Sequence, residues 1–211
     1  MYKISIEPSD IEKLPLGSFP GTIVVINKPG RELNRAIAYL KSQPMLGFDT
    51  ETKPVFTPGQ QHHNIALLQL SGPDRAYLFR IFNLGMRHRL CRILGDPLIV
   101  KIGAAVHDDV RGLKKYMPFQ EAGFVDLQKI AYEWGIRDKS VKKLAANILG
   151  MRISKTQQLS NWEAPELSDA QKMYAATDAW VCLEMYRKLL TSPKHPLTPE
   201  QLAPQQTQQN G

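Results

Sequence analysis

The amino-acid sequence predicts an α/β fold in which a mixed β-sheet is flanked by α-helices. Two observations lead to this prediction. Short apolar runs bounded by Pro, Gly and polar turn residues alternate along the chain with longer segments whose apolar residues recur at helical spacing. The chain has 211 residues, 43% of them hydrophobic and 22% charged, which suits one domain with a buried core.

The first half of the chain predicts a strand, a helix and three further strands. Thr22–Asn27 is β-branched and apolar, which indicates a strand. Arg31–Ser42 has apolar residues at roughly helical spacing, and Pro44 ends that helix. The next apolar runs, separated by turn residues, are expected to be consecutive strands of one sheet: Met45–Asp49, Ile65–Leu70 and Ala76–Phe79.

The second half continues the alternation. Pro97–Ile102 predicts a strand that leads through Gly103 into a helix at His107–Tyr116, and Phe124–Leu127 is short and extended. Two well-delimited helices follow, Ser140–Leu149 with Gly150 directly after it, and Ser168–Leu190. In the second of these, Ser168 and the residue three positions later, Gln171, form a capping box.

Three segments are expected from this pattern. Residues 1–21 form an N-terminal extension, residues 22–190 form the folded domain, and residues 191–211 form a tail. The tail holds four prolines, five glutamines and little apolar content, so we expect it to be disordered.

Composition restricts the partners and the cellular location. A formal net charge of +7 and a pI near 9.4 favour polyanionic partners, because basic side chains displace counterions from phosphates. The longest apolar run, Ala179–Leu183, is too short to cross a membrane, and the acidic N-terminus does not resemble a secretory signal. We therefore expect a cytoplasmic protein in which Cys91 and Cys182 are buried, reduced thiols.

Two acidic residues stand in the second predicted strand, Met45–Glu51. Side chains alternate along a strand, so Asp49 and Glu51 share one face with Gly47. Like charges repel, and Mg²⁺ or Mn²⁺ would compensate them because hard cations prefer oxygen ligands. The alternatives are that this strand lies at an edge with the acids in water, or that Glu51 already belongs to a turn.

A third acid lies in the last predicted helix. Tyr174, Asp178, Val181 and Met185 fall on one stripe whose last two members are apolar, so Asp178 faces the core. A carboxylate there needs a metal or a strong hydrogen-bonding partner, and a structural Tyr–Asp pair is the alternative.

Two adjacent acids, Asp108 and Asp109, begin the helix after the strand Pro97–Ile102. Asp is a favoured N-cap, so one of the pair can cap the helix while the other faces the strand ends. Position alone does not decide between them.

Together these segments resemble the DEDD superfamily of 3′–5′ exonucleases, which have a ribonuclease H-like fold. GFDTET supplies Asp49 and Glu51, KIGAAVHDDVRGL aligns Asp109 with the second motif, and QKMYAATDAW supplies Tyr174 and Asp178. The tyrosine places the resemblance in the DEDDy branch, with ribonuclease D and the Werner-type exonuclease domains. The chain looks like a stand-alone Werner-type module, which puts in doubt a tRNA-processing role of the ribonuclease D kind.

The resemblance implies a metal-dependent 3′–5′ exonuclease that uses two divalent cations, Mg²⁺ or Mn²⁺. Asp49, Glu51 and Asp178 would hold the metal that activates water, while Asp49 would bridge to a second metal supported by Asp109. Tyr174 would orient the attacking water. The expected partners are single-stranded or recessed 3′ ends, with DNA favoured. The alternatives are RNA 3′-end trimming, a non-catalytic nucleic-acid-binding module, or a scaffold whose acids only cap and solvate.

Several residues are candidates for contacts with the nucleic acid. Lys142, Lys143 and Lys155 suit phosphate contacts, although a solvated helix face explains them almost as well. Thr52, Phe56 and Trp162 complete the candidate set, Phe56 as a wedge or stacking residue. The alternatives are a turn residue packed on the core for Phe56 and a packing anchor for Trp162. The histidines His62, His63 and His107 are expected in loops or on the surface.

Overall fold

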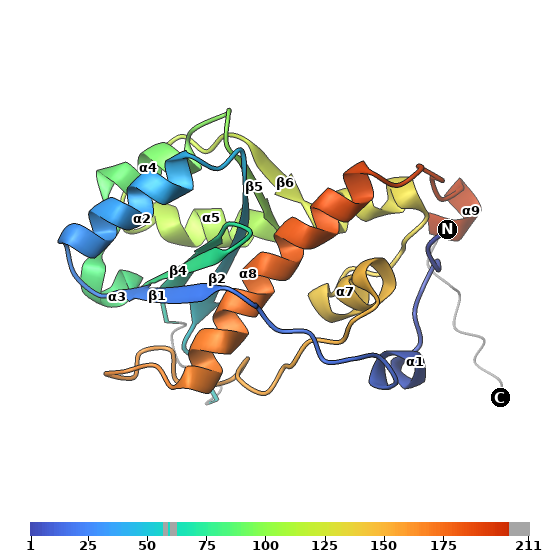
Figure 1. Cartoon of the computed structure of the whole chain (residues 1–211), viewed down its shortest axis with the longest axis horizontal. Helices are drawn as coiled ribbons and strands as arrows, with labels where there is room; N and C mark the ends of the chain where they lie inside the picture. The colour runs from blue at the N-terminus through green and yellow to red at the C-terminus, as the bar shows by residue number, and fades with distance from the viewer. Residues whose placement is uncertain (57–58, 60–62, 203–211) are drawn as a thin grey trace.

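The computed structural model describes residues 1–56, 59 and 63–202, and it confirms the predicted mixed sheet flanked by helices (Figure 1). The described strands are β1 (Thr22–Ile26), β2 (Met45–Thr52), β3 (Ile65–Ser71), β4 (Arg75–Phe79), β5 (Val100–Gly103) and β6 (Phe124–Asp126). The described helices are α1 (Pro8–Glu12), α2 (Arg31–Lys41), α3 (Ile81–Leu84), α4 (His88–Leu94), α5 (Val106–Lys114), α6 (Leu127–Ile130), the 3₁₀ helix η1 (Ala131–Trp134), α7 (Val141–Leu149), α8 (Asp169–Leu190) and α9 (Pro199–Leu202).

The sheet has the strand order β1-β4-β3-β2-β5-β6, and β2 lies inside it. β2 runs antiparallel to β3 and parallel to β5, while β1 pairs parallel with β4 and β6 pairs parallel with β5. β2 therefore has hydrogen-bonded neighbours on both sides, and it continues past Glu51 to Thr52 with a register shift between these two residues. The alternatives of an edge strand or a turn at Glu51 are wrong.

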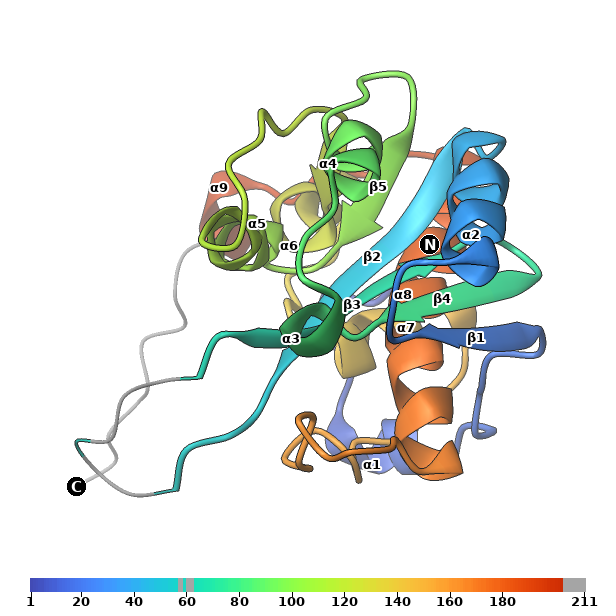
Figure 2. The same ribbon diagram turned by 90° about the vertical axis from the view of Figure 1, so that its left-hand side faces the viewer.

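The two faces of the sheet are covered by different helices (Figures 1 and 2). Leu46 and Phe48 of β2 point to one face, where they join the largest apolar cluster with residues of α2, α3, α4 and α5. The other face is crossed by α8, and there Leu67 of β3 packs in a second cluster with Tyr174 and Ala175. The alternation of side chains along β2 therefore separates an apolar face from the face that carries Asp49 and Glu51.

Gly47 allows α8 to lie directly on β2. A Cβ atom at Gly47 would come 1.9 Å from the carbonyl oxygen of Ala179, so only a residue without a side chain fits between the strand and the helix. Asp178 precedes Ala179 on α8, and Asp49 lies two residues beyond Gly47 on β2. The close approach of the two backbones therefore sets the separation of these carboxylates.

The helix caps are those predicted from the sequence. The Ser140 hydroxyl oxygen accepts a hydrogen bond from the backbone N–H of Lys143 at 3.3 Å, and Gly150 ends α7 in the left-handed conformation with φ 68°. At α8, Ser168 and Gln171 form the reciprocal capping box, with bonds of 3.2 and 3.0 Å. These caps satisfy N–H groups that the helix itself leaves unpaired.

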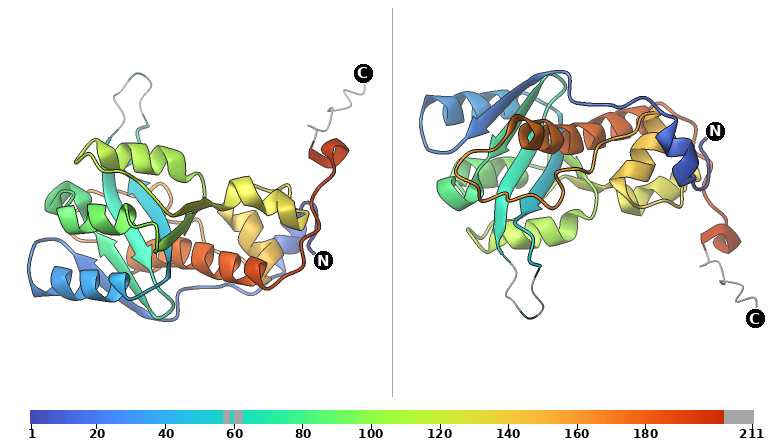
Figure 3. Two further views of the ribbon diagram at one scale, coloured as in Figure 1. Left: turned by 90° about the horizontal axis from the view of Figure 1, so that it is seen from above. Right: turned by 90° about the horizontal axis from the view of Figure 1, so that it is seen from below.

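The terminal segments pack at the end of the molecule that holds α7 (Figure 3). Ile6 and Ile11 bury their side chains against Ala146 of α7. For residues 191–202 the expectation of disorder is wrong. Leu197 is buried and donates its backbone N–H to the Tyr132 carbonyl at 3.0 Å, while the Trp134 indole N–H donates to the Ser192 carbonyl at 3.2 Å. The Lys194 ammonium lies over the Trp134 ring. Residues 203–211 lie outside the described part.

Among the described residues, no helix combines the length and the apolar character that crossing a membrane requires.

Substitution of Gly47 tests the contact between β2 and α8. Gly47→Ala places a methyl group against the Ala179 carbonyl, so we expect the free energy of unfolding to fall by about 1–3 kcal/mol, as for other overpacked cores. Chemical denaturation of wild type and variant measures this loss. The exposed α2 variant Ala38→Ser is the control. Equal stability of Gly47→Ala and wild type would contradict the close contact.

Candidate active site

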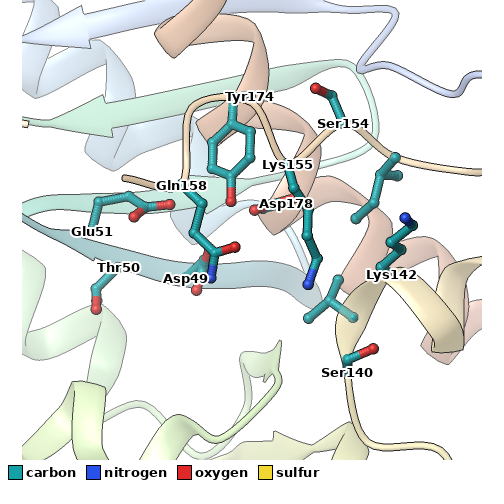
Figure 4. Close-up of a pocket in the computed structure, with 12 residues that line it drawn as sticks. Asp49, Thr50, Glu51, Ser140, Lys142, Ser154, Lys155, Gln158, Tyr174 and Asp178 are labelled. Atoms are coloured by element: carbon teal, nitrogen blue, oxygen red, sulfur yellow. The ribbon is translucent and has the colours of Figure 1, made fainter. Parts of the chain in front are cut away.

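Three carboxylates from β2 and α8 converge on one point (Figure 4). Asp49, Glu51 and Asp178 each offer one oxygen, and these atoms all lie within 4.8 Å of one another. Strand alternation puts the first two on the α8 face, and the helix stripe turns the third toward the strand. Donors of this kind and spacing suit a hard divalent cation.

Burial and mutual repulsion make this arrangement costly without a cation. Burial, and then the charges of Asp178 and Asp109, raise the pKa of Asp49 well above its usual range. Burial, followed by repulsion from Asp49, raises the pKa of Glu51 to about 10. The pKa of Asp178 is raised to about 7, chiefly by burial, while Tyr174 and the ammonium of Lys155 partly offset the shift. The three acids are therefore protonated more readily than free carboxyls, and a bound cation would reverse this.

Asp109 and Asp108 take different directions from the first turn of α5. The Asp109 carboxylate accepts a hydrogen bond from the hydroxyl of Thr50 at 2.5 Å, and burial raises its pKa to about 6. Thr50 points to the opposite side of β2 from Asp49 and Glu51 (Figure 4). Asp108 is exposed and pairs with Arg111 at 3.0 Å. Of the two acids, Asp109 is the one that lies beside the site.

The expectation that one of this pair caps α5 is wrong. The N-cap position is Ala105, which has the left-handed φ of 60° and no side chain that can accept a hydrogen bond. Its backbone N–H donates to the carboxylate of Asp126 at 3.0 Å, a residue remote in sequence that also caps α6.

Tyr174 lies one helical turn before Asp178, and its hydroxyl points toward that carboxylate (Figure 4). The ring is 8% exposed and packs against Trp162 at a centroid distance of 5.9 Å. Burial, followed by the charges of Asp178 and Glu51, raises the pKa of the phenol far above its usual value. Tyr174 therefore stays protonated and can donate or accept a hydrogen bond without acting as a base.

The carboxylates open into a cavity of about 290 Å³ between β2, α8, the start of α7 and the segment before α8. Its lining residues are Asp49, Thr50, Glu51, Ser140, Val141, Lys142, Ile153, Ser154, Lys155, Gln158, Tyr174 and Asp178. Lys142 and Lys155 bring positive charge to the same space as the acids (Figure 4). Ser154 and Gln158 were not predicted as site residues, because 153–158 is irregular and carries no periodic signal, and Ser140 was predicted only as the start of α7.

Two candidates for nucleic-acid contact do not line the cavity. The ammonium of Lys143 pairs with Asp138 at 3.2 Å and contacts the Ser5 hydroxyl, so it is turned to the N-terminal segment and does not line the cavity. Trp162 is completely buried, and a ring without exposed surface cannot stack on a base. It is a packing anchor beneath Tyr174.

The remaining candidates lie near the end of β2. Phe56 is 75% exposed, so the expectation of a residue packed on the core is wrong. Thr52 ends β2 and is half-buried, and the chain from there to Phe56 extends away from the sheet (Figure 2). His63 contacts Glu163 at 3.1 Å and His107 is exposed on α5, whereas His62 lies outside the described residues.

Comparison with known proteins adds family information. Residues 24–192 match the family model described as 3′-5′ exonuclease. The chain is 30% identical over 202 residues to the bifunctional 3′-5′ exonuclease/ATP-dependent helicase WRN of Mus musculus, covering 89% of this chain and 14% of that protein. It is 31% identical over 157 residues to DNA polymerase I of Aquifex aeolicus, covering 74% of this chain and 25% of that protein.

Ribonuclease D supplies a further relative and a similar fold. Ribonuclease D of Gluconacetobacter diazotrophicus is 27% identical over 176 residues, covering 82% of this chain and 43% of that protein. The crystal structure of Escherichia coli RNase D superposes with a TM-score of 0.70 at 23% identity, covering 80% of this chain and 44% of that one. The chain thus spans less than half the length of each of these relatives.

The raised pKa values predict how stability depends on pH. Asp109 and Asp178 have folded-state pKa values of about 6 and about 7, above the usual unfolded values, so the stability they contribute is full below about pH 4 and is lost as pH rises through 6 and 7. We expect metal-free protein to lose about 4 kcal/mol of stability from this source between pH 5 and pH 8, because each unit between pH 5 and a folded-state pKa corresponds to about 1.4 kcal/mol.

Thermal unfolding in a chelator at the two pH values measures this loss. Asp178→Asn cannot take on the charge, so its melting temperature should fall less between pH 5 and pH 8, and Mn²⁺ at pH 8 should raise it less than in wild type. The same pH response in variant and wild type would contradict the attribution of the pH-dependent stability to the buried carboxylate of Asp178.

Proposed function

This chain belongs to the 3′–5′ exonuclease family, and on that premise we propose that it is a metal-dependent nuclease that removes nucleotides from the 3′ end of a nucleic acid. The observation that carries the proposal is the convergence of Asp49, Glu51 and Asp178 in one cavity beside Tyr174. The family match supports the DEDD-type resemblance seen in the sequence. The cavity supports a site for a single strand end, because its walls leave space for little more than one nucleotide unit.

We assign the acids to a two-metal arrangement. Asp49, Glu51 and Asp178 would hold the first divalent cation, Mg²⁺ or Mn²⁺, and Asp49 would be shared with a second one supported by Asp109. When bound, such cations activate water, stabilise the leaving oxygen and neutralise charge on the phosphate. Asp109 contacts Thr50 and stands apart from the three-acid cluster, which supports a secondary role for it.

The other cavity residues bind the nucleic acid and orient the attacking water. Tyr174 holds the attacking water by a hydrogen bond, because its phenol is protonated and points toward Asp178. Lys142 and Lys155 line the cavity and would contact phosphate oxygens of the strand. Thr52, the last residue of β2, and Phe56, which lies beyond that end, would contact the nucleic acid outside the cavity. The exposed Phe56 ring is available for stacking on a base.

We propose single-stranded or recessed 3′ ends of DNA as the favoured substrate, with RNA as the alternative. The similarity to DNA polymerase I at 31% identity supports DNA, and the similarity to a ribonuclease D at 27% identity supports RNA. No lining residue of the cavity distinguishes the two by its chemistry alone, because the 2′-hydroxyl can both donate and accept hydrogen bonds.

The polarity and the metal requirement can be tested with end-labelled strands. We expect Mn²⁺- or Mg²⁺-dependent shortening of 5′-labelled DNA from a free 3′ end, no shortening when that end is blocked, and slower loss from the matching RNA. Asp49→Ala should abolish the activity, a loss of at least about 10³-fold, because the shared cation ligand is removed. Products that shorten from the 5′ side would refute the proposal.

The adjacent acids of α5 provide a matched pair for this assay. Asp109→Asn should lower kcat, because the side chain beside the site loses its charge, while the exposed Asp108→Asn should turn over at the wild-type rate. The reverse order would contradict the assignment of Asp109.

Removal of the Tyr174 hydroxyl tests its orienting role. Tyr174→Phe keeps the packing on Trp162, so we expect KM for the strand to stay close to wild type while kcat falls by about 10–10²-fold. Single-turnover rates with Mg²⁺ measure the chemical step directly. Full turnover in the variant would show that Tyr174 only packs.

A further inference from the structure

A buried amide side chain, Gln69, lies inside the sheet next to the acids. Apart from Gln69 and Ser71, β3 consists of apolar residues, and Gln69 is 0% exposed. Its Nε2 and its Oε1 have no hydrogen-bond partner among the residues that the structure describes. The other buried polar residue of β3, Ser71, donates its hydroxyl to the Gly72 carbonyl at 2.8 Å. Gln69 therefore differs from every neighbour on its strand.

The register places Gln69 directly opposite Asp49. β2 and β3 pair antiparallel with Asp49 against Gln69 and Glu51 against Leu67, so all four side chains point to the α8 face. On its other side Gln69 is opposite Leu78 of β4, which belongs with Leu67 to the apolar cluster under Tyr174 and Ala175. Gln69 thus has carboxylate on one side and hydrocarbon on the other.

An unpaired amide in such surroundings is unfavourable. A leucine or methionine would fill the same space without leaving donors and acceptors unsatisfied, so the packing of the sheet gives no reason for glutamine at this position. Asp49 is a polar neighbour that can use the amide, because opposite side chains in an antiparallel pair have Cβ atoms about 4.5–5.5 Å apart. The reach of a glutamine side chain spans that distance.

Asp49 needs such a donor. The charges of Asp178 and Asp109 repel its charge, and the backbone of Thr50 offsets this repulsion only in part. We propose that Gln69 is a positioning residue: its amide, unpaired in this structure, donates an N–H group to the Asp49 carboxylate when a divalent cation binds, and so holds that carboxylate in the orientation that accepts the cation. This inference rests on the proposed function, since Asp49 is the acid assigned to both cations.

Gln69→Met separates positioning from packing. Methionine keeps the length and the buried volume but removes the amide, so we expect the melting temperature of the metal-free protein to be equal to or above that of wild type. Calorimetric titration with Mn²⁺ should give binding about 10-fold weaker or more, as is typical when a group that orients a metal ligand is lost. With a labelled 3′ strand, kcat should fall while KM stays near the wild-type value.

Leu70→Met is the matched control, because it makes a similar change at the next position of β3, on the opposite face of the sheet. It should bind Mn²⁺ as wild type does. A Gln69→Met protein that melts lower but binds Mn²⁺ with wild-type affinity would show that Gln69 is structural and would overturn the inference. Wild-type protein that binds no Mn²⁺ would overturn the proposed function, and the inference with it.

Discussion

The contact of α8 with β2 at Gly47 is the constraint on which the site depends. Because Gly47 has no side chain, the Ala179 carbonyl lies where a Cβ atom would be, and the helix cannot move farther from or closer to the strand without losing its packing. This contact brings Asp178, from near the end of the domain, to two acids from its beginning. The apolar residues that surround the contact, such as Leu67 and Ala175, keep this geometry rigid.

The same packing makes the site electrostatically unfavourable in the absence of a cation. Asp49, Glu51 and Asp178 are half-buried and held close together, and each has a raised pKa. The Lys155 ammonium offsets only part of the rise in the pKa of Asp178. The unpaired amide of Gln69 lies on the neighbouring strand, opposite Asp49. Stability given up in this way is typical of functional sites, where the arrangement is stabilised by a ligand and not by the folded chain alone.

The local elements and the acids were predictable, whereas several side-chain environments were not. The capping box at Ser168 and the alternation along β2 depend on neighbours in sequence, so short-range patterns reveal them. Trp162 and Lys143 could not be placed in this way. The first is buried under Tyr174 and the second is drawn to Asp138 and Ser5, and such partners are set by distant segments. The burial of Leu197 and the hydrogen bond from Trp134 to Ser192, in a stretch rich in Pro and Gln, were hidden for the same reason.

The sequence by itself determined the α/β class, the order of the main strands and helices, the shared face of Asp49 and Glu51, and the inward direction of Asp178. All of these follow from the periods of strands and helices. Tertiary structure alone decided that β2 is an interior strand, that the Asp109 carboxylate accepts from Thr50, and that Gln69 lies opposite Asp49. Strand order, register and the rotation of a helix on a sheet are fixed by contacts between segments far apart in the chain, and periodicity within one segment does not contain them.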